Sequence, residues 1–214
     1  MLNVRKYKEI ILILTFSLIC LLLYFIFPTQ GFSQKITSLV IFFVIFPLLF
    51  QKVILKKELG NLGLTIGNWK KGLIFSFISL ALSFLVLFLL FKYPAFQKNY
   101  SIPAIFSENF YLFIVYEIFI MGFFYLCFSF FFNGFILFSL ERKFKNLSLI
   151  ISFILFILFM FLIGNLVWLS SFMIMNIFFG SIIALKSRSL LYPSITGLLF
   201  YLIADSLVIK FLSN

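Results

Sequence analysis

Three polar features inside the apolar stretches of this chain have side chains suited to chemistry. One is the pair Asn133-Gly134 in FFFNGFILFSLERKF, residues 130–144, where an apolar helix ends in a charged cluster. The other two are the acids Glu117 and Asp205, each within a predicted membrane span. A carboxyl group at membrane depth is costly, so these acids are candidates for a functional site as well as for packing.

Several kinds of chemistry are disfavoured by what the chain lacks. It contains no histidine, which removes the commonest metal ligand and the commonest general base at neutral pH. Cys20 and Cys127 lie in apolar runs, and two such cysteines make neither a disulfide framework nor a metal site. The net charge of +11 comes from short clusters between apolar runs. This placement argues against nucleic-acid binding and is typical of orientation signals in a membrane protein.

The elements that position these residues are predicted to be membrane-spanning helices. Of 214 residues, 64% are apolar and only 11% are charged, which leaves too little polar surface for a soluble domain. The sequence therefore predicts one integral membrane domain, residues 1–214, with an all-α, polytopic transmembrane fold. The seven predicted spans are residues 9–27, 36–51, 72–92, 110–140, 147–163, 171–185 and 190–211. Because about 20 helical residues cross a bilayer core, spans two, five and six are predicted to be short.

The basic residues predict the orientation of these spans. With the N-terminus in the cytoplasm and the C-terminus outside, thirteen Lys and Arg residues lie inside and four outside, the asymmetry that sets membrane topology. We therefore expect a multi-pass protein of the inner or plasma membrane. Residues 56–72, KKELGNLGLTIGNWKKG, are predicted to form an inside loop in the membrane interface, with a ligand-binding loop as the alternative. The fourth span is long enough to tilt or to bend near Gly134.

The opening stretch resembles a family signature, and two later segments extend the resemblance. FFFNGFILFSLERKF resembles the first signature of the CPBP family, the CAAX-protease and bacteriocin-processing (Abi-like) intramembrane metalloproteases. Residues 152–160, SFILFILFM, resemble its second signature, and residues 178–197, FFGSIIALKSRSLLYPSITG, resemble its closing segment. The Leu-Gly-Leu of residues 62–64 resembles a segment between the early helices of the family. The resemblance covers residues 50–205, and its CPBP-like core is residues 110–211.

The resemblance implies a degenerate catalytic site. The family's Glu falls on Ser129 and its Arg on Asn133, while the two His fall on Met160 and Gly197 and the following Asn or equivalent on Tyr201. These side chains do not supply the imidazole and carboxylate groups that hold zinc and activate water, so a zinc cofactor is not supported. We therefore expect a catalytically inactive member, a pseudoenzyme. It would bind a protein, peptide or lipid partner in the former substrate cavity, with Asn133 in the place of the Arg.

Two other functions stay open at this point. A second register places Tyr116-Glu117 through Gly122 on the first signature, and the chain would then be an active CPBP-type endopeptidase. Alternatively, Glu117 and Asp205 would serve proton coupling in a small transporter or permease subunit. Both acids are predicted to lie about 9–11 Å below the outer boundary, where they could face each other. The simpler interpretation is packing, in which these acids hydrogen-bond a neighbouring Ser or Tyr. Asn133, Asn165 and Asn176 would likewise form interhelical hydrogen bonds.

Overall fold

The fold is an all-α membrane helical bundle, as the composition predicts. The computed structural model describes residues 2–28, 30–99, 109–164 and 171–212. The helical elements in chain order are α1 (Leu2–Ile26), α2 (Phe32–Val40), η1 (Ile41–Ile45), α3 (Phe46–Leu49), η2 (Phe50–Ile54), η3 (Leu59–Leu62), α4 (Trp69–Leu90), α5 (Pro94–Asn99), α7 (Phe110–Val115), η4 (Tyr116–Met121), α8 (Gly122–Ser129), η5 (Phe130–Ile136), α9 (Leu137–Phe144), α10 (Leu147–Leu162), α11 (Ser171–Ser187) and α12 (Leu191–Leu212).

Five helices within the described residues are long and apolar enough to cross a membrane. They run over Tyr7–Ile26, Phe32–Ile54, Trp69–Leu90, Phe110–Phe144 and Leu191–Lys210. Two shorter apolar helices, α10 and α11, fall on predicted spans five and six, which the sequence also predicts to be short. Each of the seven predicted spans thus corresponds to an apolar helix of the structure.

The second span differs from its prediction. Residues 36–51 were expected as a short span, whereas the helix runs over 23 residues from Phe32 to Ile54. Its first turn holds Ser33, Gln34 and Lys35, whose polarity hides the helix start in the sequence. The helix is continuous because α2, η1, α3 and η2 follow one another without a break and differ only in hydrogen-bond spacing. It is therefore long enough to cross a hydrocarbon core of about 30 Å.

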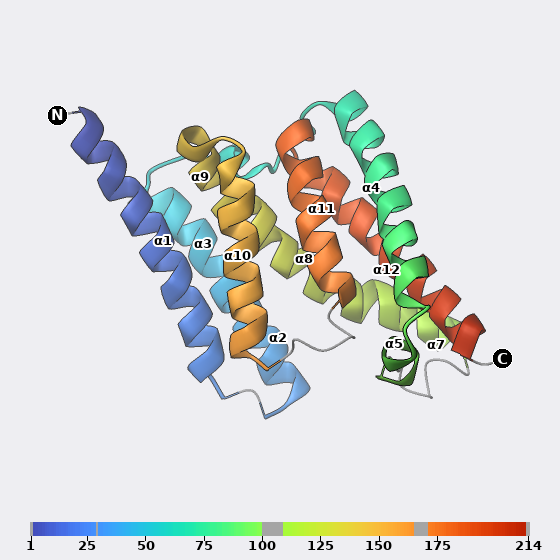
Figure 1. Cartoon of the computed structure of the whole chain (residues 1–214). Coiled ribbons are helices and arrows are strands. Elements are labelled where there is room, and N and C mark those ends of the chain that lie inside the picture. Colours follow the sequence, from blue (N-terminus) through green and yellow to red (C-terminus); the bar gives the residue numbers. More distant parts are fainter. Residues whose placement is uncertain (1, 29, 100–108, 165–170, 213–214) are drawn as a thin grey trace.

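The fourth and longest helix joins the two halves of the bundle. In Figure 1 it runs from α7 through α8 to α9, with α1, α2, α3 and α10 on one side and α4, α11 and α12 on the other. Its α8 part packs against α11 and α12, and its η5 part packs against α10, α11 and α1. The N-terminus and the C-terminus lie at opposite ends of the bundle (Figure 1). Residues of this helix therefore line the interface between the halves.

Aromatic rings fill the core on the α10 side. The Phe43 ring stacks on Phe131 with centroids 4.7 Å apart and contacts Phe159 edge-on at 5.3 Å. Phe132 and Phe156 form a second edge-to-face pair with centroids 5.0 Å apart. All five side chains are buried. Between membrane helices, where lipid is as apolar as the side chains, such close contacts stabilise the bundle mainly by dispersion and ring geometry.

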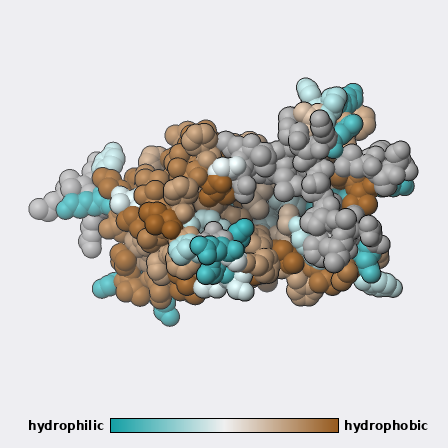
Figure 2. Space-filling view, turned by 90° about the horizontal axis from the view of Figure 1, so that it is seen from below, coloured by the Kyte–Doolittle hydropathy of each residue, from teal (hydrophilic) through white to brown (hydrophobic). Residues whose placement is uncertain are grey.

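The outer surface is apolar, as a lipid-facing surface must be. Large hydrophobic side chains such as Phe77, Phe88 and Phe161 are exposed on the flanks of the helices. Figure 2 shows the bundle from below, where hydrophobic residues cover most of the described surface and hydrophilic ones gather in separate patches. An exposed apolar surface of this extent fits a protein whose solvent is the bilayer.

The predicted inside segments meet at one end of the bundle. The loop before α4 is tied to the turn between α11 and α12, since the Leu190 amide donates to the Gly63 carbonyl at 2.8 Å and the Asn68 amide donates to Ser187 at 2.7 Å. Lys57 forms an ion pair with Glu9 of α1. The loop is therefore an ordered part of the fold, while the side of the membrane that it faces stays a prediction.

Gly67 illustrates why this loop needs glycine. Its φ of +58° lies in the left-handed region that L side chains rarely adopt, and a Cβ atom there would overlap the Ser187 carbonyl oxygen. Gly164 has a similar φ of +67°, but a Cβ atom there would meet nothing within 4 Å. A substitution at Gly164 would therefore be strained by the backbone conformation alone, whereas a substitution at Gly67 would also overlap a neighbouring segment.

We expect Gly67→Ala to destabilise the protein more than Gly164→Ala does. The Gly164 substitution carries the conformational cost alone, about 1–2 kcal/mol, whereas the Gly67 substitution adds the overlap with the α11–α12 turn. The free energy of unfolding in mixed detergent micelles measures both. Equal losses for the two variants would show that the loop does not pack on the turn as described.

Candidate functional site

Asn133 lies in a packed polar cluster inside the bundle. It is in the π-helical segment η5 and is completely buried. Its amide nitrogen donates to the Ser129 hydroxyl at 3.3 Å, and its amide oxygen accepts a hydrogen bond from Ser181 of α11 at 2.7 Å. A Cβ atom at Gly180 would lie 2.6 Å from the Asn133 nitrogen, so the amide packs directly on the α11 backbone. As predicted, Asn133 makes an interhelical hydrogen bond.

The Tyr125 side chain lies among Ser129, Gly197 and Tyr201, three of the positions that the family resemblance singles out. It is completely buried, and its hydroxyl donates to the Pro193 carbonyl of α12 at 2.9 Å. The same hydroxyl lies beside Ser129. A Cβ atom at Gly197 would overlap the Tyr125 ring, and the ring centroid of Tyr201 lies 5.8 Å away. The structure thus brings Ser129, Gly197 and Tyr201 together around one side chain.

Met160 lies on α10, on the aromatic side of the bundle. It is 2% exposed and belongs to the same hydrophobic core as Phe156 and Phe159, the residues before it on the buried face of α10. Those two rings pack on the rings of η5 and α8, as the Phe132–Phe156 and Phe128–Phe159 contacts show. Met160, on which the resemblance would place the family's first His, is therefore an apolar core side chain.

The Asn133 side chain is closely packed, and an internal pocket beside it stays a prediction. Both polar atoms of the Asn133 side chain have close partners, and Tyr125 occupies the space opposite Gly197. The apolar groove described below is lined by none of the five positions that the family resemblance singles out. The interior is closely packed at Gly197 because a tyrosine ring on α8 packs into the gap that this glycine leaves on α12.

The structure also brings Glu117 and Asp205 together. Glu117 lies in the π-helical segment η4 and Asp205 on α12, which pack against each other, and each residue is 2% exposed. The two carboxyl groups are close enough to interact. Tyr201 lies one turn before Asp205 and has the Asn176 side chain as a further neighbour. The buried polar groups therefore form one series, from Asn133 through Tyr125 and Tyr201 to the acids. Asn165 lies outside the described residues.

The two π-helical segments put these residues on one face of the fourth helix. Glu117 and Tyr125 are eight residues apart, which in an α-helix of about 100° per residue leaves them about 80° apart. The extra residue of the π turn in η4 reduces this angle to about 20°. Segment η5 acts in the same way around Asn133. The sequence does not predict Tyr125 as a site residue, because α-helical periodicity places it on a different face from Glu117. The one indication in the sequence is that Tyr125 lies four residues before Ser129, which puts both on the same face of a helix.

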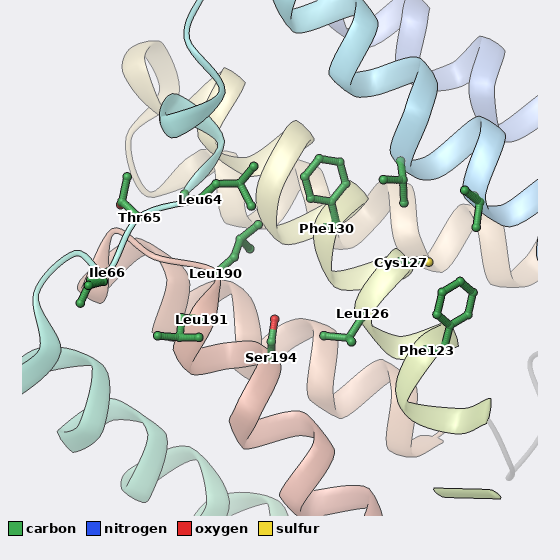
Figure 3. Close-up of a pocket in the computed structure, with 13 residues that line it drawn as sticks. Leu64, Thr65, Ile66, Phe123, Leu126, Cys127, Phe130, Leu190, Leu191 and Ser194 are labelled. Carbon is green, nitrogen blue, oxygen red and sulfur yellow. The ribbon is translucent and has the colours of Figure 1, made fainter. Parts of the chain in front are cut away.

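A separate apolar groove opens on the opposite flank of α8. It has a volume of about 740 Å³ and lies between the helix of η1, the loop before α4, α8 and the start of α12 (Figure 3). Its lining residues are Val40, Val44, Gly63, Leu64, Thr65, Ile66, Phe123, Leu126, Cys127, Phe130, Leu190, Leu191 and Ser194. Figure 3 shows Leu126 and Ser194 facing each other across the space between α8 and α12. Several lining residues, including Leu64, Ile66 and Leu191, are exposed, so the groove is open to the surroundings of the bundle.

The described residues contain no group of three or more His, Cys, Asp or Glu side chains that could hold a metal ion. No family model, curated protein or solved structure matches the chain. The candidate site consists of a packed series of polar residues inside the bundle and an apolar groove beside it.

We expect Gly197→Ala to lower the free energy of unfolding by about 1–3 kcal/mol, because the added methyl group overlaps the Tyr125 ring. In a Tyr125→Leu background the same substitution should cost much less, since the obstructing ring is absent. Chemical unfolding of the four proteins in mixed micelles measures this coupling. If Gly197→Ala costs the same in both backgrounds, the ring does not occupy the gap opposite Gly197.

Proposed function

We propose that this integral membrane protein is a catalytically inactive relative of the CPBP proteases that binds a membrane lipid through the groove beside α8. The observation that carries the proposal is the combination of a filled polar interior with an open apolar groove. In the interior, Asn133 and Tyr125 pack closely at the positions that the family resemblance singles out. The groove offers a site for an apolar chain next to them.

The filled interior supports the lack of catalysis. A metallopeptidase of this kind needs ligands for a cation and a carboxylate beside the bound water. Here Asn133 and Ser129 bond to each other, and Gly197 receives the Tyr125 ring. These contacts use the polar atoms and the volume that the catalytic groups of the family would need.

The groove suits an apolar chain because its walls are almost entirely hydrocarbon. Among the lining residues, only Thr65 and Ser194 carry a hydroxyl group and only Cys127 carries a thiol; the other side chains are apolar. The Thr65 hydroxyl already donates to the Arg188 carbonyl at 3.2 Å. An extended peptide needs hydrogen-bond partners for its backbone at membrane depth, and this lining provides few of them. A lipid chain has no such need, which favours a lipid over a peptide occupant.

The charges near the groove favour a lipid with a negative headgroup. The loop that carries Leu64 and Ile66 leads into α4, which begins with the exposed residues Trp69, Lys70 and Lys71. The Lys70 ammonium lies 5.7 Å from the Trp69 ring centroid. Tryptophan and lysine side by side are typical of the headgroup level, where ammonium groups attract lipid phosphates. We place this end of the bundle at the cytoplasmic leaflet, in line with the predicted orientation.

We expect Leu191→Trp to reduce the phospholipid that stays bound to the purified protein several-fold, because the larger ring fills the groove. Leu199→Trp is the matched control, since Leu199 lies on the same helix and is equally exposed, at 47%, but does not line the groove. Mass spectrometry of lipids retained after detergent purification measures the difference. Equal retention in both variants, or retention of a peptide in place of a phospholipid, would contradict lipid binding in the groove.

We expect protein purified from native membranes to contain no stoichiometric zinc and to cleave no prenylated or membrane-embedded test peptide. Elemental analysis and a peptide cleavage assay measure these properties. The competing hypothesis, an active endopeptidase with Glu117 as its catalytic acid, predicts about one zinc per chain and cleavage that Glu117→Gln abolishes. That pair of results would contradict catalytic inactivity without bearing on the groove.

A further inference from the structure

Glu117 has an environment that neither packing nor the groove accounts for. Its side chain is 2% exposed and lies in the π-helical turn η4, near the start of the fourth helix. Gly122, one turn later, lets α12 approach closely, since a Cβ atom there would lie 2.5 Å from the Leu198 side chain. This close approach brings Asp205 of α12 to the Glu117 carboxyl group. π-helical turns often mark functional positions in membrane and soluble proteins alike.

The hydrogen bonds around Glu117 are incomplete for an ionised carboxylate. Both carboxyl oxygens are buried, and neither accepts a hydrogen bond from the described part of the chain. The Asn176 amide nitrogen, next to Tyr201, is also buried without an acceptor among the described residues. A carboxylate with no donors is among the costliest groups to bury. A carboxylic acid is not, because its own O–H can donate to a neighbouring carboxylate.

The charges around Glu117 lead to the same conclusion. Within the part of the chain that the structure describes, the titratable groups near it are Tyr116 on its own helix and Asp205 and Tyr201 on α12. No Lys or Arg of the described ranges forms an ion pair with Glu117. Two negative charges side by side in a medium of low dielectric repel strongly, so carboxyl groups in this arrangement hold one proton between them.

We propose that Glu117 and Asp205 form an intramembrane proton-binding site, in which Glu117 carries the proton and donates a hydrogen bond to Asp205. When the proton is transferred, the Glu117 O–H bond breaks and an O–H bond forms on an Asp205 oxygen, while Glu117 keeps the electron pair. When the proton is released to water, the carboxyl O–H bond breaks in the same way and a new O–H bond forms on the water molecule. The ligand of this site is a proton, and its binding does not depend on whether the groove holds a lipid.

A proton fits this site better than a metal ion does. Calcium binds six to eight oxygen ligands and magnesium needs octahedral coordination. The pair offers two carboxyl groups, and the phenol groups of Tyr116 and Tyr201 are neutral neighbours. A single proton shared by the carboxyl groups satisfies a Glu117 oxygen without further ligands.

Infrared spectroscopy of the full chain reconstituted in phosphatidylcholine vesicles tests the proposal. We expect a carbonyl band of a protonated carboxyl group at neutral pH in sodium buffer, shifted to lower frequency in D₂O. The band should fall to background in Glu117→Gln. Glu58→Gln, the same change at an exposed position, should leave it unaltered. Absence of the band in the wild type, or its persistence in Glu117→Gln, would overturn the proposal.

A second variant keeps the test decisive if Glu117→Gln does not fold. Asp205→Asn leaves Glu117 in place but replaces the group that accepts its hydrogen bond. The band should therefore remain and change frequency, because an amide oxygen is a weaker acceptor than a carboxylate. An unchanged band frequency in Asp205→Asn would contradict the shared proton. A band that appears in the wild type only after sodium is removed would identify a sodium site and overturn the proposal.

Discussion

The contact between the Tyr125 ring and the backbone at Gly197 sets how closely the fourth helix approaches α12. The ring packs against the α12 backbone because Gly197 has no side chain, and its hydroxyl donates to the Pro193 carbonyl on the same helix. This contact fixes α8 against α12, and α11 then packs over both through Gly180 and Asn133. The polar series, the closed interior and the position of the groove all follow from how closely these helices approach.

Hydrocarbon solvent explains why the polar residues gather in one series. A buried hydroxyl or amide in a membrane has no water to bond, so it bonds a carbonyl of its own helix, as Ser17 and Thr196 do, or a group on a neighbouring helix. Ser152 illustrates this, because its hydroxyl donates to the Phe132 carbonyl at 2.7 Å across the α10 interface. Ser181 does the same for Asn133. Glu117 differs, because neither of its buried carboxyl oxygens accepts a hydrogen bond from the described residues. In the proton-binding site that we propose, its own proton makes the hydrogen bond.

Much of the fold follows from the sequence, and less of the site does. Apolar runs predict the long apolar helices of the bundle, because length and hydropathy are local properties. They do not predict the short helices η3 and α5, which lie between the predicted spans. The second helix was predicted too short because polar residues such as Gln34 occupy its first turn. Residue spacing predicted that Glu117 and Asp205 share a depth, but not that Tyr125 fills the interior. That contact depends on π-helical turns and on Gly197 of a distant helix, and no local pattern encodes either.

The π-helical turns η4 and η5 also constrain how this gene can change. Each turn contains one residue more than an α-helical turn, so a deletion of one codon inside it would restore an ordinary helix. Glu117 and Tyr125 would then be seven α-helical residues apart, which again leaves them about 20° apart on the helix. A deletion in an α-helical part of the fourth helix would instead rotate all residues beyond it by about 100° relative to those before it. Loss of one residue from the fourth helix should therefore be better tolerated inside a π-helical turn than in the α-helical parts beside it.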